Sequence, residues 1–234
     1  MSHSTSYADF NWKSLGRISK NTTLIIPVGG LEAHGTHLPL DTDTRIPHAL
    51  ALELAKRTDS LVLPPIEYGY TYTLRIFPGT VSLRSRTLYL LVRDLVGELV
   101  RNGFRKILFL NGHGGNGAVI RQVLKELEDE VDFRACVVSW WEIKEIGASV
   151  GHADAIETSL YLHVNPNYKL PRVKIEKSRN YFGSVIPTPK NSFTPSGYAG
   201  DIKNISRARG QKIAKIIINK LVTLIKNDLL LEEK

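Results

Sequence analysis

The sequence predicts an α/β fold with three layers, α/β/α, and a mainly parallel central sheet. Short β-like runs alternate with amphipathic helical runs along the chain, and this alternation is typical of parallel strands joined by helices that cover both faces of a sheet. The run TTLIIPV at 22–28 has the composition of a buried strand. We expect all of residues 1–234 to form a single domain, because a chain of this length buries one full core.

The elements follow in a regular order. Strands are predicted at 22–28, 61–66, 105–110 and 133–140. Helices are predicted at 46–57, then from a cap at Ser85 or Thr87 to about Arg101, and at 117–130, 153–164 and 206–227. Residues 178–204 are rich in Gly, Pro, Ser and Asn and too long for a simple connector. We expect this segment to cover the substrate or to form an oligomer contact.

Composition excludes several classes of protein. No apolar run approaches the roughly 20 residues that a membrane span needs, so no membrane partner is expected. Residues 1–16 lack the apolar stretch of a signal peptide, and we therefore expect a cytoplasmic protein. Cys136 is the single cysteine, which rules out an intrachain disulfide and a cysteine-rich zinc module. Any metal must be held by His, Asp and Glu.

The charge is unevenly distributed. The formal charge is +8 at pH 7, and residues 167–234 carry 14 Lys/Arg against 5 Asp/Glu. A basic segment indicates an anionic partner or simply a solvated surface. Lysines spaced among helical Ile and Leu in KIAKIIINKLVTLIKN favour the solvated surface. No basic cluster alternates with aromatic residues, so we expect no nucleic-acid partner.

Polar clusters follow the predicted strands at their carboxyl ends, where ligands bind in open parallel sheets. The first cluster lies in GGLEAHGTHLPLDTDTR and contains Glu32, His34, His37, Asp41 and Asp43. Two histidines and three carboxylates in an otherwise apolar loop suit zinc, manganese or ferrous iron. The structural alternative is that Asp43 or Thr44 only caps the helix that follows.

The second cluster, NGHGGNG at 111–117, allows two interpretations. Gly112, Gly114 and Gly117 fit the dinucleotide-binding pattern G-x-G-x-x-G, and Glu142 lies where a ribose-binding acid would be. An NAD-binding oxidoreductase is therefore one alternative. The motif is in mid-chain, however, and His113 occupies the turn that a pyrophosphate would approach. The other interpretation is that His113 reaches a metal from a second strand end.

The third cluster is GHADAIETS at 151–159. His152 precedes a predicted helix and Glu157 lies within it. The two side chains would supply a proton shuttle and a further ligand. Alternatively, Asp154 and Glu157 only complement the dipole of the helix.

The three motifs together resemble the creatininase family of amidohydrolases. The chain has E-A-H-G-T-H-L-P-L-D-T-D at 32–43, N-G-H-G-G-N at 111–116 and H-A-D-A-I-E-T-S at 152–159. A late G-x-x-G-D element is present at 197–201. The resemblance spans about residues 20–210 and implies a creatininase-like fold, in which the glycines at 112–117 belong to a metal loop and not to a dinucleotide site.

The resemblance implies a centre of two divalent ions (Fe²⁺, Zn²⁺ or Mn²⁺). Glu32 and His113 would bind one ion, His34 would bind the other, and Asp43 would bridge both. These roles are carried over from the family motif position by position.

Two departures from the family pattern affect this site. Creatininase has a glutamate at the position of Gly115, so the second ion lacks a ligand here. Glu157 is our candidate replacement. Asp154 stands where the family has glycine, and it is expected to reshape the pocket. His152 matches the histidine that transfers protons in the family.

The resemblance also implies a small-molecule substrate, with a phosphorylated one among the alternatives, and a homo-oligomer such as a hexamer. Family members include creatinine amidohydrolases and a deformylase that releases formate from 2-amino-5-formylamino-6-ribosylaminopyrimidin-4(3H)-one 5'-monophosphate in riboflavin and deazaflavin-cofactor (F420) biosynthesis. The missing glutamate at Gly115 and the basic C-terminal third favour the deformylase. Creatinine amidohydrolase is the alternative, and a non-catalytic metal-dependent scaffold is a third.

Overall fold

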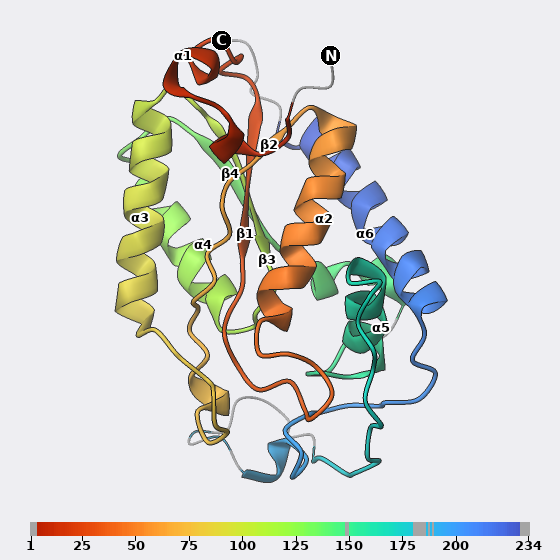
Figure 1. Cartoon of the computed structure of the whole chain (residues 1–234). Coiled ribbons are helices and arrows are strands. Elements are labelled where there is room, and N and C mark those ends of the chain that lie inside the picture. The colour runs from red at the N-terminus through yellow and green to blue at the C-terminus, as the bar shows by residue number, and fades with distance from the viewer. Residues whose placement is uncertain (1–3, 148–149, 180–185, 187, 189, 230–234) are drawn as a thin grey trace.

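The computed structural model describes residues 4–147, 150–179, 186, 188 and 190–229. At its centre is a sheet of four parallel strands in the order β2-β1-β3-β4 (Figure 1). The strands are β1 (Thr23–Val28), β2 (Leu61–Val62), β3 (Lys106–Asn111) and β4 (Arg134–Ser139). The predicted parallel sheet is confirmed.

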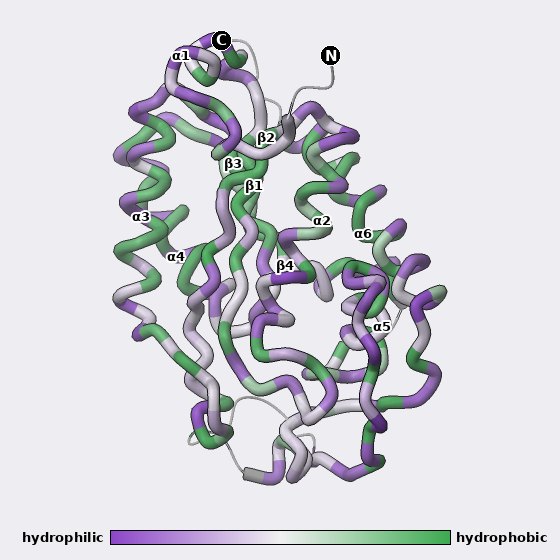
Figure 2. Tube along the Cα trace, viewed as in Figure 1, coloured by the Kyte–Doolittle hydropathy of each residue, from purple (hydrophilic) through white to green (hydrophobic). Residues whose placement is uncertain are grey.

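Helices cover both faces of the sheet, which confirms the three-layer prediction (Figure 1). On one face lie α3 (Ser85–Arg101) and α4 (Asn116–Leu127). On the other lie α2 (Thr42–Thr58), α5 (Ala155–Val164) and α6 (Arg207–Asn227). Apolar residues fill the two spaces between the layers, and hydrophilic residues lie mostly on the outside (Figure 2). Alternate residues of β1 divide between the two cores, since successive strand side chains point to opposite faces.

The register of the sheet aligns the strand ends. Val28 of β1 pairs with Asn111 of β3, and Asn111 pairs with Ser139 of β4. The chain therefore leaves three neighbouring strands at the same edge of the sheet. The loops that carry the three polar motifs begin at or close to this edge.

Short elements complete the described chain. They are α1 (Trp12–Leu15) and the 3-10 helices Tyr7–Asp9, Tyr72–Leu74, Trp140–Glu142, Lys144–Ile146 and Lys190–Ser192. None of the helices in the described residues has the length and apolarity that a membrane crossing requires.

Several predicted boundaries are wrong. Helix α4, predicted at 117–130, ends at Leu127. The strand predicted at 61–66 stops at Val62 because Pro64 and Pro65 have no N–H for the ladder. Helix α2 begins at Thr42 and not at 46, so Pro47 lies within it. Neither Ser85 nor Thr87 caps α3, because the helix starts at Ser85 and its cap residue, Arg84, makes no capping side-chain bond.

Candidate metal centre

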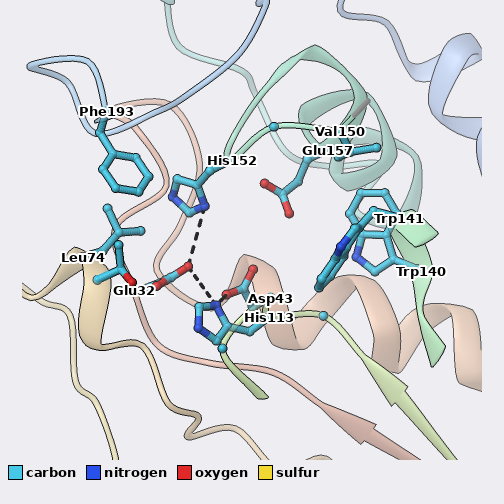
Figure 3. A pocket seen from close by; sticks show the side chains of 15 residues that line it. Glu32, Asp43, Leu74, His113, Trp140, Trp141, Val150, His152, Glu157 and Phe193 are labelled. Carbon is cyan, nitrogen blue, oxygen red and sulfur yellow. Dashed lines mark hydrogen bonds and ion pairs between the residues drawn. The ribbon is translucent and has the colours of Figure 1, made fainter. Parts of the chain in front are cut away.

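Six acidic and histidine side chains converge beyond the carboxyl edge of the sheet. They come from three places in the chain: the segment from the end of β1 into the first turn of α2, the loop between β3 and α4, and residues 152–157 at the start of α5 (Figures 1 and 3). The six are Glu32, His34, Asp43, His113, His152 and Glu157. All the residues predicted to form the site are therefore brought together.

Asp43 lies at the centre of this cluster. Its Oδ1 is 2.9 Å from His34 Nε2, and its Oδ2 is 3.0 Å from His113 Nδ1. The side chain is almost completely buried in the first turn of α2. A carboxylate that faces two imidazoles with separate oxygens has the arrangement of a bridge between two cations.

Both histidines are oriented by their second ring nitrogen. The backbone oxygen of Glu32 accepts a hydrogen bond from His34 Nδ1 at 3.0 Å, and the backbone oxygen of Tyr70 accepts one from His113 Nε2 at 2.9 Å. A carbonyl only accepts, so each of these nitrogens carries a proton. The nitrogen facing Asp43 can then present a lone pair, and histidine ligands of metals are commonly held in this way.

The carboxylates of Glu32 and Glu157 lie on opposite sides of Asp43. Glu32 Oε1 is 3.1 Å from His113 Nδ1, and Glu157 Oε2 is 3.9 Å from His34 Nε2. Three sets of three donors result: Glu32, Asp43 and His113; His34, Asp43 and Glu157; and Glu32, His34 and His152. The first two sets share Asp43.

The residues of the cluster suit divalent cations. Glu32 Oε2 is buried and has no hydrogen-bond partner, which is costly for a carboxylate oxygen unless a cation contacts it. Within each set the donor atoms lie within 4.8 Å of one another, a spacing that one ion can span. Nitrogen and carboxylate donors together fit Zn²⁺, Mn²⁺ and Fe²⁺.

The pKa values of the buried side chains also indicate a site for cations. Burial by itself would lower the pKa of His34, but Asp43 and Glu157 outweigh it and raise that pKa to about 10. Burial would also lower the pKa of His113, but the nearby carboxylates of Glu32 and Asp43 outweigh it and raise that pKa well above its usual value. Protons on these imidazoles occupy the positions where cations would neutralise the carboxylates.

His152 and Glu157 are shifted mainly by burial. Burial, with His34 nearby, lowers the pKa of His152 to about 3. Burial raises the pKa of Glu157 to about 8, although His34 opposes the shift. His152 Nε2 donates to the backbone oxygen of Ala33 at 2.7 Å, and Nδ1 lies 3.6 Å from Glu32 Oε1. His152 is therefore neutral at pH 7, with the lone pair of Nδ1 directed at the cluster (Figure 3).

The loop at 111–117 is fastened at both ends by asparagines that the sequence analysis did not assign a role. Asn111 Oδ1 accepts from His113 N and Asn111 Nδ2 donates to His113 O. Asn116 donates to Gly29 O and accepts from Tyr70 N. The sequence contained a signal for this role, because an asparagine, whose side chain has both a donor and an acceptor, stands at each end of N-G-H-G-G-N.

Close packing explains two of the glycines in this loop. A Cβ on Gly112 would lie 1.9 Å from the backbone oxygen of Asp43, and a Cβ on Gly115 would lie 2.1 Å from that of Tyr70. The glutamate that creatininase has at the position of Gly115 cannot be accommodated with Tyr70 where it lies. The backbone at Tyr70 also covers the start of α4, where the alternative dinucleotide interpretation requires a pyrophosphate.

Other residues of the three motifs lie outside the cluster. Asp41 precedes α2 and pairs with Arg45 at 2.6 Å on the surface. His37 is buried, but it hydrogen-bonds Ala153 and Thr158. Asp154 caps α5 by accepting from Ile156 N and Glu157 N. Asp154 therefore has the helix-end role of the structural alternative, whereas the Glu157 carboxylate lies in the cluster.

A cavity of about 380 Å³ opens onto the cluster. Its walls are largely apolar or aromatic and include Leu74, Trp140, Trp141, Val150 and Phe193 (Figure 3). Trp140 and Trp141 directly follow β4 at the carboxyl edge where the sequence predicts the ligand site, whereas Leu74, Val150 and Phe193 were not predicted to reach it. Among the described residues that line the cavity there is no lysine or arginine. Phe193 is the part of 178–204 that reaches the site, and residues 180–185, 187 and 189 of that predicted covering segment lie outside the described residues.

An α/β fold with His, Asp and Glu donors at the carboxyl edge of its sheet defines a candidate divalent-metal centre. The sequence model of the family Creatininase, described as "Creatinine amidohydrolase", matches residues 8–225. The chain therefore belongs to the creatininase family of metal-dependent amidohydrolases.

Curated relatives differ in their activities. Creatinine amidohydrolase of Pseudomonas putida is 29% identical, over 97% of this chain and 98% of the relative. The mycofactocin precursor peptide peptidase of Mycolicibacterium smegmatis is 30% identical, over 87% of this chain and 84% of the relative. The formylaminopyrimidine ribonucleotide deformylase of Methanococcus maripaludis is 25% identical, over 87% and 90%.

Solved creatininase structures share the fold. A structure described as "Creatininase Mn" and one described as "E122Q mutant creatininase, Zn-Zn type" both have a TM-score of 0.85 and 28% identity, covering 97% of this chain and 99% of theirs. Their descriptions name manganese and zinc, both of which the donor set of this chain suits.

Proposed function

We propose that this chain is a two-metal amidohydrolase in which Asp43 bridges the ions. Glu32 and His113 complete one ion's protein ligands, and His34 and Glu157 complete the other's. The observation that carries the proposal is the division of the Asp43 carboxylate between His34 and His113, at 2.9 and 3.0 Å. Glu157 replaces the metal ligand that Gly115 cannot provide.

Two divalent ions in this centre would lower the pKa of a bound water towards about 7 and polarise the substrate carbonyl. His152 is neutral at pH 7, so it begins the reaction as a proton acceptor at Nδ1. The proton it gains is then available for the leaving nitrogen, which cannot depart as an amine anion. The bond from Nε2 to Ala33 O keeps the ring in one orientation throughout.

The cavity supports a small, flat and uncharged amide as substrate. Trp140, Trp141 and Phe193 offer aromatic surfaces to a ring, and a volume of about 380 Å³ suits a compact molecule. A phosphate would require a cationic partner, and the described lining residues include no lysine or arginine. We therefore favour a creatinine-like cyclic amide over the phosphorylated substrate of the deformylase.

The deformylase is the second candidate. The observation that favours it is the basic C-terminal third, in which residues 167–234 carry 14 Lys/Arg against 5 Asp/Glu. The cytoplasmic location and the hexameric assembly also remain predictions.

The experiment is a direct comparison of substrates with the metal-loaded protein. Creatinine hydrolysis is measured as creatine formed, deformylation as formate released, and peptide cleavage as new amino groups from a test peptide. We expect turnover of creatinine or a related cyclic amide, and its loss in chelator. Formate release from the ribonucleotide with no creatine would overturn the substrate assignment but leave the two-metal centre intact. Activity that survives full metal removal would overturn the two-metal centre, whichever substrate is turned over.

A further inference from the structure

His37 belongs to the same motif as Glu32 and His34 but has no place in the metal centre. Its side chain is 1% exposed, and Nε2 lies 3.0 Å from the backbone oxygen of Ala153. A carbonyl only accepts, so Nε2 carries the proton and donates it there. Thr158 Oγ1, 3.1 Å from the same nitrogen, is a second partner. The motif between β1 and α2 is thereby tied to the segment that starts α5.

Ala153 has a strained backbone that needs such support. Its φ is 50°, in the left-handed region, which costs a residue with a Cβ about 1–3 kcal/mol. Both peptide groups of Ala153 are used. Its carbonyl accepts from His37, and its N–H donates to Glu157 Oε2 at 2.6 Å. Ala153 also directly follows His152.

The N–H of Ala153 determines where the Glu157 carboxylate lies. The oxygen that accepts this bond is Oε2, the same atom that lies 3.9 Å from His34 Nε2. If the peptide at Ala153 turned, Oε2 would lose its donor and the carboxylate would lose its position beside His34. The conformation of one alanine thus controls one side of the cluster.

We propose that His37 is a positioning residue for the second metal: by holding the Ala153 carbonyl, it fixes the backbone that aims Glu157 at the ion shared with His34. The inference rests on the proposed two-metal function. A residue needed only to fill space would be apolar, because His37 Nδ1 is buried without a hydrogen-bond partner, and an unpaired buried nitrogen costs about 1–3 kcal/mol. The donor at Nε2 is what an apolar residue would lack.

The test compares His37→Gln with His37→Leu. The glutamine amide nitrogen can reach the Ala153 carbonyl as Nε2 does, whereas leucine fills similar space with no donor. Each purified protein is titrated with Zn²⁺ after chelation, and ions per chain and both affinities are measured alongside kcat and KM. We expect two ions in the wild type and in H37Q. In H37L we expect one of the two affinities, that of the ion at His34 and Glu157, to fall by about 10–100-fold. We also expect kcat to fall by a larger factor than KM rises.

Tyr168→Phe is the matched control. Tyr168 donates from its hydroxyl to the backbone oxygen of His37 at 2.7 Å, so Y168F loosens the same neighbourhood without touching Ala153. We expect Y168F to keep both ions. His37→Met replaces H37L if the leucine variant does not fold.

Three outcomes separate the ideas. Two ions of unchanged affinity in H37L would overturn the role of His37 and leave the two-metal centre standing. Equal losses in H37Q and H37L would also overturn it, since the donor would not matter. Fewer than two ions in the wild type would contradict the proposed function itself.

Discussion

The Asp43 carboxylate is divided between two histidines from different parts of the chain: Oδ1 lies 2.9 Å from His34 Nε2, and Oδ2 lies 3.0 Å from His113 Nδ1. His34 is nine residues before Asp43, whereas His113 is seventy residues after it. The first turn of α2 holds Asp43 between them.

Asp43→Asn should remove both ions. An amide has one oxygen and no charge, so it cannot bridge two cations, and we expect both affinities to fall by at least about 100-fold. Metal content by mass spectrometry and Zn²⁺ titration measure the change. Asp41→Asn is the control, because Asp41 lies two residues away and pairs with Arg45 on the surface. A variant D43N that still bound two ions would rule out the bridge.

His152→Asn should separate chemistry from metal binding. The variant loses the proton acceptor at Nδ1 but none of the proposed ligands, so we expect two ions per chain and a kcat lower by about 10²–10⁴. Steady-state kinetics and metal content are measured on the same sample. His163→Asn, in the last turn of α5, should keep full activity. Loss of an ion in H152N would instead identify His152 as a ligand.

Gly115→Ala should damage the site, and Gly114→Ala should not. A Cβ at 115 would lie 2.1 Å from Tyr70 O and 2.8 Å from His113 Nε2, whereas a Cβ at 114 meets nothing within 4 Å. We expect G115A to lose about 1–3 kcal/mol of unfolding free energy and to bind the ion at His113 less tightly. G114A should stay within about 0.5 kcal/mol of the wild type. Denaturant unfolding curves decide, and equal stability of the two variants would contradict the packing argument.

Metal binding should release protons. At pH 7 the metal-free cluster holds extra protons on His34, whose pKa is raised to about 10, and on His113. Ions must displace both, and also the proton on Glu157, whose pKa is raised to about 8. The logarithm of the combined affinity for the two ions should therefore rise with pH by nearly three per pH unit near neutrality. Calorimetry in buffers of different ionisation enthalpy counts the protons. A pH-independent affinity would show that the histidines are not ligands.

The stability of the metal-free protein should depend on pH in a defined direction. The folded pKa of His34 exceeds its unfolded value, so its contribution is fully present below about pH 6.5 and is lost as pH rises towards 10. Glu157, with its pKa raised to about 8, also destabilises the folded state as pH rises from about 4.5 to 8. We expect the Tm in chelator to fall from about pH 6.5 to 10, because below pH 6.5 the lowered pKa of His152 acts in the opposite direction. Metal-loaded protein should not show the same fall, because ions replace the His34 proton.

Much of the fold and of the candidate site could be predicted from local sequence patterns. Alternating strand and helix runs were enough for the three-layer fold, and the three motifs contained all six residues of the cluster. Errors arose where one residue overrides a pattern. Pro64 and Pro65 shortened β2, and α2 started earlier than its apolar periodicity indicated. The distinction between Asp43 in the site and Asp41 on the surface also followed the family motif.

The sequence by itself determined the class of chemistry, because it placed carboxylates and imidazoles after strands that share one edge of a parallel sheet. Only the tertiary structure decided how they meet. It gave each Asp43 oxygen its own histidine and brought Glu157 beside His34. It also closed the space at Gly115 with the backbone of Tyr70. These outcomes depend on contacts between residues far apart in the chain, set by sheet register and close packing, which no local pattern encodes.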